Sequence, residues 1–295
     1  MLNMLKIKKA IFPVAGMGTR FLPATKANPK EMMPVIDKPL IQYAVEEAIQ
    51  TGITELIFVT NSSKRAIEDH FDANFELETK LKSQGKDELL NMVQNILPAG
   101  VSCVYIRQPE ALGLGHAILC AKHLIGSDPF AVLLADDLID SSKGSSCLQQ
   151  MNVKFRKVQS SIVAVEKIDL TDSTKYGMVG TEKSFSGFGK INAIIEKPKM
   201  ELAPSNLGVV GRYILMPEIF DILEVIKPGA NGEIQLTDAV AILIAQQSVY
   251  ALEFNGTRFD CGSKLGYLQA IVSYGLKHEE IADEFKEYLK TVGKS

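Results

Sequence analysis

A turn with two glycines follows the first apolar run of the chain, and it is the first place where the sequence could hold a phosphate. The apolar run 10–15 leads into Gly16 and Gly18, and Arg20 comes two residues later. Glycines let a backbone approach an anion closely and turn successive N–H groups toward it, and Arg20 adds a permanently charged guanidinium. The P-loop pattern is absent, and Phe21 stands where a dinucleotide-binding motif has its third glycine. The turn could therefore bind a phosphate in another way, or be a tight turn without a ligand.

The loop 29–34 is a second candidate for phosphate binding, because Pro29 and Pro34 flank the adjacent opposite charges of Lys30 and Glu31. Prolines restrict the backbone, so this loop can hold the Lys30 ammonium group in place. The alternative is a solvated pair of opposite charges on the surface, which contributes little.

Carboxylates that could hold a metal ion follow a very apolar run. The run 130–135 ends directly before Asp136 and Asp137. A hard cation such as Mg²⁺ prefers one or two carboxylates together with waters and phosphate oxygens. We favour Asp136 as the metal ligand and predict that Asp137 caps a turn or a helix.

Two further polar groups stand at the ends of predicted strands. Lys197 follows Glu196 and offers a second charge for a phosphate, and Asp260 offers a second carboxylate for the metal. The alternatives are a salt bridge at a strand end for Lys197 and an N-cap for Asp260. Spacing alone does not decide between these roles.

Alternating strands and helices must position these groups. Short apolar runs predict buried strands, and apolar residues at helical spacing predict helices between them. The predicted strands are 10–15, 56–60, 102–106, 130–135 and 161–165, and the predicted helices are 39–50, 64–71 and 115–124. This alternation predicts an α/β protein with a mainly parallel sheet and helices on both faces. Ligands of such sheets bind beyond the carboxyl ends of the strands, where the candidate residues stand.

The second half has longer segments punctuated by glycine, which we expect to add strands to the same sheet, some of them antiparallel. These segments are 176–180, 187–196 and 206–215, with helices expected near 218–226 and 234–246. No linker or repeat divides the chain, so we predict a single domain over residues 1–295. The charged, helical stretch 76–95 is interpreted as an insertion. The amphipathic stretch 278–290 is expected to cover the core, with a subunit contact as the alternative.

Composition excludes several classes of partner. The formal net charge is −3, from 32 basic and 35 acidic residues, so no overall field attracts nucleic acid or an anionic membrane. The four cysteines form neither a CxxC pair nor a zinc-type cluster. The first ten residues lack the pattern of a secretory signal, and no apolar run is long enough to span a bilayer. We therefore expect a cytoplasmic protein.

Several motifs carry a resemblance to a known family. The stretch 12–34 reads FPVAGMGTRFLPATKANPKEMMP, and it is followed by DKPLIQY at 37–43, QPEALGLGH at 108–116, GEIQLTD at 232–238 and FDCG at 259–262. With these motifs the chain resembles the sugar nucleotidyltransferases, and within them the bacterial UTP–glucose-1-phosphate uridylyltransferases. The resemblance implies a Rossmann-like fold of the nucleotide-diphospho-sugar transferase type. It also implies Mg²⁺-dependent transfer from UTP to glucose 1-phosphate, giving UDP-glucose and pyrophosphate, in a homodimer or homotetramer.

The resemblance also implies roles for individual residues. Nucleotide contacts would come from Ala15, Gly16, Gly18, Glu31, Gln108 and Gly113, and triphosphate contacts from Arg20 and Lys30. The metal would be held by Asp136 and Asp260, the glucose by Gly177, Glu196 and Gly211, and the phosphate of glucose 1-phosphate by Lys197. Residues 1–165 would form mainly the nucleotide-binding half, and residues 166–295 the sugar-phosphate half with the C-terminal helices.

The implied reaction needs no general base, because a phosphate monoester with a second pKa of about 6 is already largely ionised at neutral pH. His116 is accordingly interpreted as a structural residue. Two alternatives stay open. One is a thymidylyltransferase that uses dTTP, although the joined motifs at 24–27 and 29–32 favour UTP. The other is a silent regulatory subunit, against which the presence of all the charged candidates argues.

Overall fold

One mixed sheet forms the centre of the computed structural model, which describes residues 5–141, 144–229 and 232–293. Residues 1–4 of the predicted signal-free start lie outside the described residues. In spatial order the strands are β5 (Ser102–Arg107), β4 (Glu55–Thr60), β1 (Lys9–Pro13), β6 (Phe130–Leu133), β11 (Leu207–Leu215), β8 (Ile162–Lys167), β12 (Tyr250–Glu253), β10 (Phe188–Glu196) and β9 (Gly177–Thr181).

The first half of the chain builds a parallel part of the sheet, and the second half adds antiparallel strands. Strands β5, β4, β1 and β6 are parallel to one another, whereas β11 runs antiparallel to both β6 and β8. Strand β12 is parallel to β8, and β10 is antiparallel to β12 and β9. The predicted α/β class, with antiparallel strands added by the second half, is confirmed.

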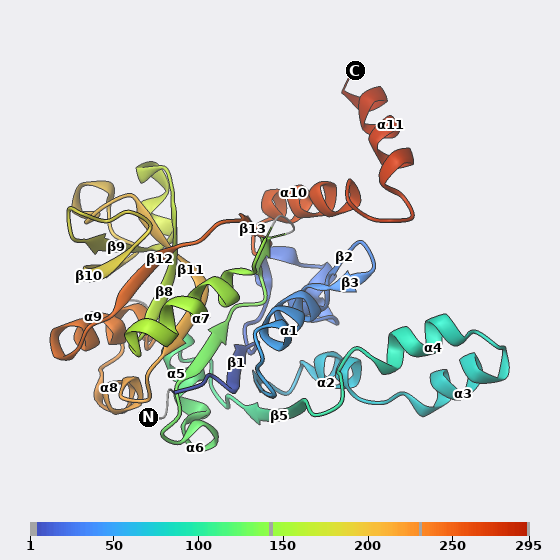
Figure 1. The fold of residues 1–295 in the computed structure, drawn as a ribbon, viewed down its shortest axis with the longest axis horizontal. Coiled ribbons are helices and arrows are strands. Elements are labelled where there is room, and N and C mark those ends of the chain that lie inside the picture. The colour runs from blue at the N-terminus through green and yellow to red at the C-terminus, as the bar shows by residue number, and fades with distance from the viewer. Residues whose placement is uncertain (1–4, 142–143, 230–231, 294–295) are drawn as a thin grey trace.

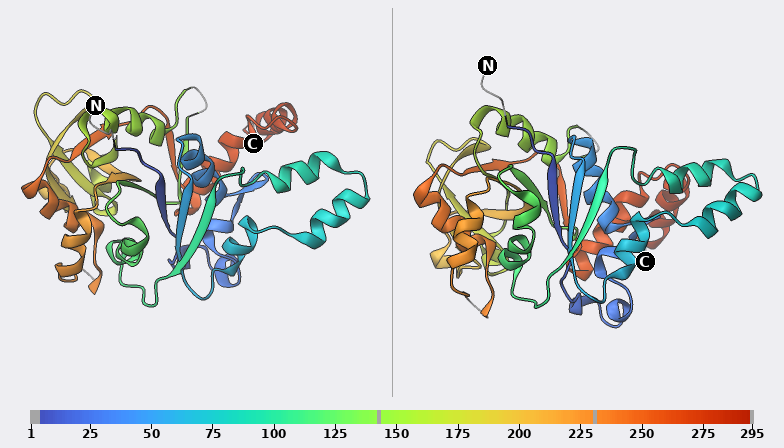
Figure 2. Two further views of the ribbon diagram at one scale, coloured as in Figure 1. Left: turned by 60° about the horizontal axis from the view of Figure 1, so that its bottom comes forward. Right: turned by 90° about the horizontal axis from the view of Figure 1, so that it is seen from below.

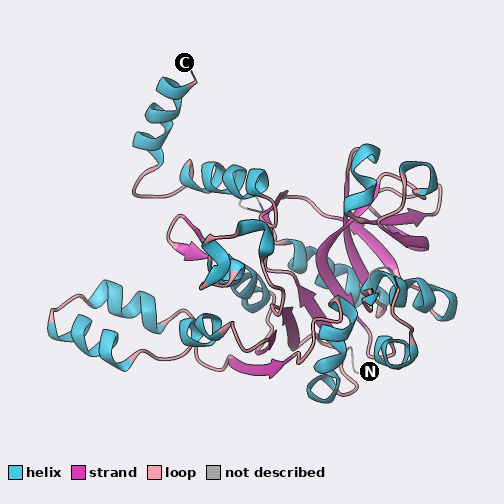
Figure 3. Ribbon diagram, turned by 180° about the vertical axis from the view of Figure 1, so that it is seen from behind, coloured by secondary structure: helices cyan, strands magenta, loops and turns pink. Residues whose placement is uncertain are grey.

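Successive side chains of each strand point to opposite faces of the sheet and belong to two hydrophobic clusters, one on each face. In β1, Ala10 and Phe12 belong to one cluster and Ile11 to the other, as the period of two in a strand requires. The Phe12 face is covered by α1 (Leu40–Gln50), α2 (Arg65–Phe71) and α7 (Cys147–Val158). The Ile11 face is covered by α5 (Leu114–Cys120), α6 (Lys122–Ile125), α8 (Ile219–Val225) and α9 (Leu236–Gln246). Figure 3 shows helices on both sides of the strands.

A small antiparallel ribbon, which the sequence did not predict, stands beside the sheet. It pairs β7 (Asp137–Asp140) with β13 (Thr257–Asp260), and the register places Asp137 opposite Asp260. The outer side of the ribbon packs on α10 (Lys264–Gly275) and on the hairpin of β2 (Pro34–Val35) and β3 (Lys38–Pro39), through Leu138, Cys261 and their neighbours. The ribbon thus joins the middle of the chain to its last part. Short 3-10 helices complete the fold at Thr19–Phe21, Ala24–Lys26, Lys30–Met32, Leu170–Lys175 and Met200–Leu202.

Two helical segments project from this body (Figures 1 and 2). The first is the pair α3 (Phe75–Ser83) and α4 (Asp87–Gln94), which confirms that the stretch 76–95 is helical. The second is α11 (Ala282–Val292), which buries none of its residues. The prediction that the stretch 278–290 covers the core is wrong, because the chain leaves the body after α10 and Phe285 packs instead against Gly275 at the end of that helix. Within the described ranges, no helix has both the length and the apolar character needed to cross a membrane.

Candidate active site

A cavity of about 920 Å³ opens beyond the ends of several strands and is lined by both halves of the chain. Half of the predicted site residues line it, namely Arg20, Asp136, Gly177, Glu196, Lys197, Gly211 and Asp260. The other half do not line this cavity, namely Ala15, Gly16, Gly18, Lys30, Glu31, Gln108 and Gly113. Residues predicted for the acceptor and the metal therefore share one space, and most of those predicted for the nucleotide lie outside it.

The two predicted metal ligands converge at Gly262. A side-chain carbon built on Gly262 would lie 3.0 Å from an oxygen of Asp136 and 3.0 Å from an oxygen of Asp260, and 3.4 Å from a guanidinium nitrogen of Arg20. Glycine leaves this space free. Over the part of the chain that the structure describes, no cluster of three or more His, Cys, Asp or Glu residues forms a metal site. Two carboxylates nevertheless fit a magnesium ion that takes its remaining ligands from water and phosphate.

Lys30 forms an ion pair with one of these carboxylates. Its Nζ lies 2.6 Å from Oδ2 of Asp136. Burial alone raises the pKa of Asp136, but the charge of Lys30 and its hydrogen bond outweigh burial, so that the pKa lies below its ordinary value. Burial likewise lowers the pKa of Lys30, and Asp136 and Glu31 together raise it above the ordinary value. Both groups are therefore charged at neutral pH.

Glu31 points away from the cavity. Its carboxylate lies 2.7 Å from Nζ of Lys64, and the two side chains are only 2% and 4% exposed. Burial raises the pKa of Glu31, and the charges of Lys64 and Lys30 oppose that rise. The sequence alternative of a solvated surface pair between Lys30 and Glu31 is thus not what the structure shows. Lys30 pairs with Asp136 and Glu31 pairs with Lys64. The buried Glu31–Lys64 pair holds the loop against the interior.

The glycine turn rests on the Lys30 loop. Gly18 has a φ of 63°, in the left-handed region that favours glycine, and a side-chain carbon there would lie 3.2 Å from Cβ of Lys30. Oγ1 of Thr25 donates a hydrogen bond of 2.7 Å to the carbonyl of Gly18, and Nδ2 of Asn61 donates one of 2.6 Å to the carbonyl of Ala15. These bonds hold the turn, while nothing lies within 4 Å of the side-chain position of Gly16. Gly16 is thus open to a ligand.

Gln108 is held in place at the start of a second turn. Its Nε2 donates a hydrogen bond of 3.1 Å to the carbonyl of Gly113 and lies 3.0 Å from Nδ1 of His116. The turn also contacts the second half of the chain, because the N–H of Ile234 donates to the carbonyl of Leu112 at 2.7 Å. His116 therefore contacts a predicted uracil-binding residue, and nothing in this arrangement requires it to take part in chemistry.

The residues predicted for the sugar and its phosphate line the same cavity. The Lys197 N–H donates a hydrogen bond of 3.0 Å to the carbonyl of Tyr176. Its side chain is 54% exposed, and its Nζ lies 3.1 Å from a carboxylate oxygen of Glu196. A side-chain carbon on Gly177 would lie 3.0 Å from Oγ1 of Thr237. The sequence prediction missed Thr237, although it lies within the 232–238 motif.

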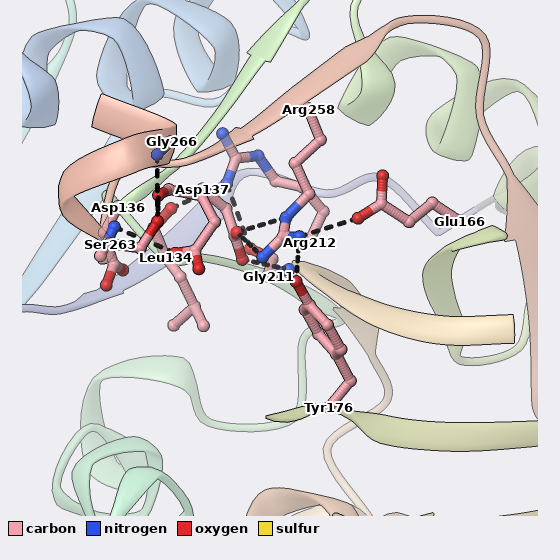
Figure 4. Close-up of polar contacts among 12 residues, drawn as sticks. Leu134, Asp136, Asp137, Glu166, Tyr176, Gly211, Arg212, Arg258, Ser263 and Gly266 are labelled. Carbon is pink, nitrogen blue, oxygen red and sulfur yellow. Dashed lines mark hydrogen bonds and ion pairs between the residues drawn. The ribbon is translucent and has the colours of Figure 1, made fainter. Parts of the chain in front are cut away.

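Asp137 does not cap a turn or a helix, and that prediction is wrong. Its Oδ1 lies 2.5 Å from Nε of Arg258, and its Oδ2 accepts a hydrogen bond of 2.8 Å from the N–H of Gly211 (Figure 4). An arginine 121 residues away in the chain binds a buried carboxylate more strongly than local capping does. Glu166 and Tyr176 also contact Arg258. Sequence reasoning missed these residues because nothing in the chain marks such a distant pairing.

A third buried ion pair supports the end of β6. Arg212 is 1% exposed and its Nε lies 2.9 Å from a carboxylate oxygen of Glu47 on α1. The same guanidinium donates a hydrogen bond of 2.9 Å to the carbonyl of Leu134. The segment that delivers Asp136 is thereby tied to the core.

Comparison with known proteins identifies the family. The model of the nucleotidyl transferase family matches residues 9–275. The chain is 46% identical over 295 residues to UTP–glucose-1-phosphate uridylyltransferase of Streptococcus pyogenes, covering 99% of this chain and 96% of the relative. It is 47% identical over 287 residues to the enzyme of that name from Staphylococcus epidermidis, covering 97% of this chain and 99% of the relative.

Solved structures agree with the sequence comparison. UDP-glucose pyrophosphorylase from Acinetobacter baumannii has a TM-score of 0.91 and 46% identity, over 97% of this chain and all of the other. A UDP-glucose pyrophosphorylase complexed with UDP-glucose has a TM-score of 0.85 and 47% identity, over 92% of this chain and all of the other. Likeness of this extent in both sequence and fold shows that the chain belongs to the nucleotidyl transferase family, and within it to the UTP–glucose-1-phosphate uridylyltransferases.

Proposed function

We propose that this protein transfers the uridylyl group of UTP to glucose 1-phosphate and releases UDP-glucose and pyrophosphate. The observation that carries the proposal is the meeting of Asp136, Asp260 and Lys197 at one cavity, in a chain with full-length likeness to uridylyltransferases. Among the similar structures are one described as UTP-bound and one complexed with UDP-glucose. The two carboxylates suit a metal that accompanies a triphosphate, and the lysine suits a phosphorylated acceptor.

UTP occupies the glycine-turn side of the site in this proposal. Backbone groups of Ala15, Gly16 and Gly18 approach the nucleotide, and Gln108 and Gly113 hold the uracil. The buried position of Gln108 and its contacts with Gly113 and His116 support this assignment, because they fix the amide before the base arrives.

Glucose 1-phosphate occupies the cavity. Glu196 accepts hydrogen bonds from sugar hydroxyls, Gly177 and Gly211 contact the sugar, and Lys197 contacts the phosphate. We add Thr237, whose hydroxyl lies beside Gly177 at the edge of the same space.

Mg²⁺ is the proposed cofactor, held by Asp136 and Asp260, and when bound it withdraws charge from the phosphate oxygens of UTP. The types of ligand support this proposal. One oxygen each of Asp136 and Asp260 faces the open point at Gly262, and the Lys30 ammonium group shows that a cation can lie beside Asp136. Hard oxygen ligands in small number are what this ion takes when substrate phosphates complete its shell.

The transfer is an in-line displacement without a covalent intermediate. A phosphate oxygen of glucose 1-phosphate attacks the α-phosphorus of UTP, a new P–O bond forms, and the bond to the pyrophosphate oxygen breaks. Two like unit charges about 4 Å apart repel by roughly 4 kcal/mol at an effective dielectric constant near 20. Arg20 and Lys30 on the nucleotide side and Lys197 on the acceptor side offset that repulsion and stabilise the developing charge. We propose that Glu31 supports this step indirectly, since its carboxylate is buried against Lys64.

The protein is proposed to work as a homodimer or homotetramer in the cytoplasm. The outer side of α10 exposes Leu268, Val272 and Leu276, which lie on one side of the helix because they are four residues apart. Burial of this face against a second copy would remove apolar surface from water. The four free cysteines support a reducing compartment. Sedimentation of the wild type and of a Leu268→Asp, Val272→Asp double variant tests the assembly. We expect an oligomeric wild type and a dissociated variant. A monomeric wild type, or a variant that assembles like the wild type, would contradict the proposal.

Pyrophosphate release with different substrate pairs tests the function. UTP and dTTP should each be combined with glucose 1-phosphate and with galactose 1-phosphate, with Mg²⁺ present. We expect the highest kcat/KM for UTP with glucose 1-phosphate. Preference for dTTP would identify a thymidylyltransferase instead, and a methyl group in an apolar pocket changes the free energy by about 1–3 kcal/mol. Binding of UDP-glucose without any release would identify a regulatory subunit.

A further inference from the structure

Arg258 joins three separate elements beneath the cavity. Its side chain is 8% exposed. Its Nε lies 2.5 Å from Asp137 on β7, and its Nη1 lies 2.8 Å from Glu166 on β8 and 3.3 Å from the hydroxyl of Tyr176, which directly precedes β9 (Figure 4). The guanidinium also lies 5.1 Å from the centre of the Tyr176 ring, within the range of a cation–π contact.

These contacts connect the metal carboxylates to the proposed phosphate-binding lysine. Arg258 is two residues before Asp260 on β13, and its partner Asp137 directly follows Asp136. At the other end, the carbonyl of Tyr176 accepts a hydrogen bond of 3.0 Å from the N–H of Lys197. The Arg258 side chain is thus linked to the metal carboxylates through Asp137 and to Lys197 through Tyr176.

Arg258 also removes Asp137 from the set of available metal ligands. Both oxygens of Asp137 are engaged, one by Arg258 and the other by the N–H of Gly211. Asp136 and Asp260 therefore face the open point at Gly262, whereas both oxygens of Asp137 are bound elsewhere.

We propose that Arg258 is a positioning residue that sets the placement of Lys197 and Gly177 relative to Asp136 and Asp260, acting through Asp137 and Tyr176. The inference rests on the proposed function. Arg258 lines the cavity, but its guanidinium is engaged by Asp137, Glu166 and Tyr176. In this proposal it acts by aligning the acceptor phosphate with the nucleotide, and misplacement by about 1 Å can cost about 10²-fold in rate.

Arg212, whose side chain is also buried, does not connect the same groups as Arg258. Arg212 pairs with Glu47 on α1 and donates hydrogen bonds to the carbonyls of Leu134 and Gly211, so its polar partners differ from those of Arg258. A general support of the fold would affect binding of both substrates alike. A positioning role affects mainly the acceptor.

Two variants and a matched control test the inference. Arg258→Lys keeps the charge but cannot make the same fork of contacts. Tyr176→Phe removes the hydroxyl and keeps the ring beneath the guanidinium. Tyr43→Phe is the control, because the Tyr43 hydroxyl donates a hydrogen bond of 2.8 Å to the carbonyl of Val35, away from the cavity. Steady-state kinetics are measured with each substrate varied, and calorimetry measures binding of UDP-glucose without divalent metal.

We expect Arg258→Lys to lower kcat/KM for glucose 1-phosphate by about 10²-fold, with the KM for UTP within about twofold of wild type. Tyr176→Phe should raise the KM for glucose 1-phosphate by about 5-fold, as loss of one hydrogen bond implies, and both variants should bind UDP-glucose more weakly without metal. Tyr43→Phe should behave as wild type. Equal changes for both substrates, or Tyr176→Phe indistinguishable from Tyr43→Phe, would overturn the inference alone.

The proposed function is judged separately, on the wild-type protein. Absence of pyrophosphate release and of UDP-glucose binding in the wild type would overturn the function and the inference with it. If Arg258→Lys fails to fold, the Tyr176→Phe comparison decides.

Discussion

The Nζ of Lys30 lies 2.6 Å from Oδ2 of Asp136, so the cation proposed for the triphosphate is paired with a carboxylate proposed for the metal. One carboxylate oxygen cannot hold the ammonium group and the metal in the same place. We expect that Lys30 exchanges Asp136 for phosphate oxygens when the nucleotide arrives with its metal. In the ligand-free protein the ion pair keeps both groups charged and close to their working positions.

Replacement of Lys30 by methionine should separate these two roles. We expect kcat/KM for UTP to fall by about 10²–10³-fold, since a preorganised donor to developing charge is lost. Binding of Mn²⁺ in the absence of nucleotide should become tighter, because no ammonium group competes for Asp136. Kinetics and electron paramagnetic resonance of free Mn²⁺ measure the two effects. Lys38→Met, which removes a lysine paired with Glu46 on the surface, is the control, and weaker Mn²⁺ binding by Lys30→Met would contradict the competition.

Asp136→Asn and Asp260→Asn should each weaken metal binding. A neutral amide replaces one of two anionic ligands, so the Mg²⁺ concentration for half-maximal activity should rise by at least about 10-fold. Titration of activity against Mg²⁺ and direct titration with Mn²⁺ provide the measurement. Asp128→Asn, in an exposed pair with Lys9, should leave both curves unchanged. An unchanged curve for either site variant would remove that residue from the metal site.

Lys197→Ala should impair use of the acceptor more than use of the nucleotide. The ammonium group faces the cavity and contacts Glu196, so its loss should raise the KM for glucose 1-phosphate and lower kcat, by about 10²-fold in kcat/KM. Lys199→Ala is a matched control, because Lys199 is exposed two residues further along and does not line the cavity. Near wild-type kcat/KM in Lys197→Ala would exclude the assigned role.

Lys64→Met should destabilise the protein in a pH-dependent way. Removal of one partner from a buried pair costs about 3–5 kcal/mol, measured by urea denaturation near pH 7.5. Burial already raises the pKa of Glu31, and loss of Lys64 removes an interaction that lowers it. A carboxyl group with a raised pKa binds protons more tightly in the folded state, so stability falls as pH rises from the unfolded value of about 4.3 through the folded pKa.

The cost of Lys64→Met should therefore be smaller at pH 5 than at pH 7.5. In the double variant with Glu31→Gln the extra pH dependence should vanish, because no titrating group is left in the pair. A cost that is the same at both pH values would show that Glu31 stays ionised without its partner.

The main elements of the fold were predictable because strands and helices carry local periodicity. The strand at 130–135 is an example: it was expected from its run of apolar residues, and the structure has β6 there with Asp136 beyond its end. Candidate residues at strand ends followed from the same logic, since parallel strands deliver their carboxyl ends to one edge. The short strands β7 and β13 escaped prediction, because their pairing depends on residues more than a hundred positions apart.

The supporting charges of the site could not be predicted. Glu31 stands next to Lys30, yet it pairs with Lys64, and Asp137 stands next to Asp136, yet it pairs with Arg258. In each case one of the two neighbouring charged residues belongs to the Lys30–Asp136 pair and the other is held by a residue distant in the chain. Which residue does which depends on burial, and burial is decided by the packing of distant elements. The apolar side of α11 was misjudged for the same reason, since its pattern does not say what it contacts.

Because β7 and β13 are far apart in the chain, the pair of Asp136 and Asp260 is completed only once β13 has been synthesised. Asp136 is joined to the growing chain more than a hundred residues before Asp260. Until β13 pairs with β7, the nascent polypeptide carries one carboxylate of the pair and lacks the other. A prematurely terminated product that ends before β13 would therefore be inert even where its first strands and helices had folded.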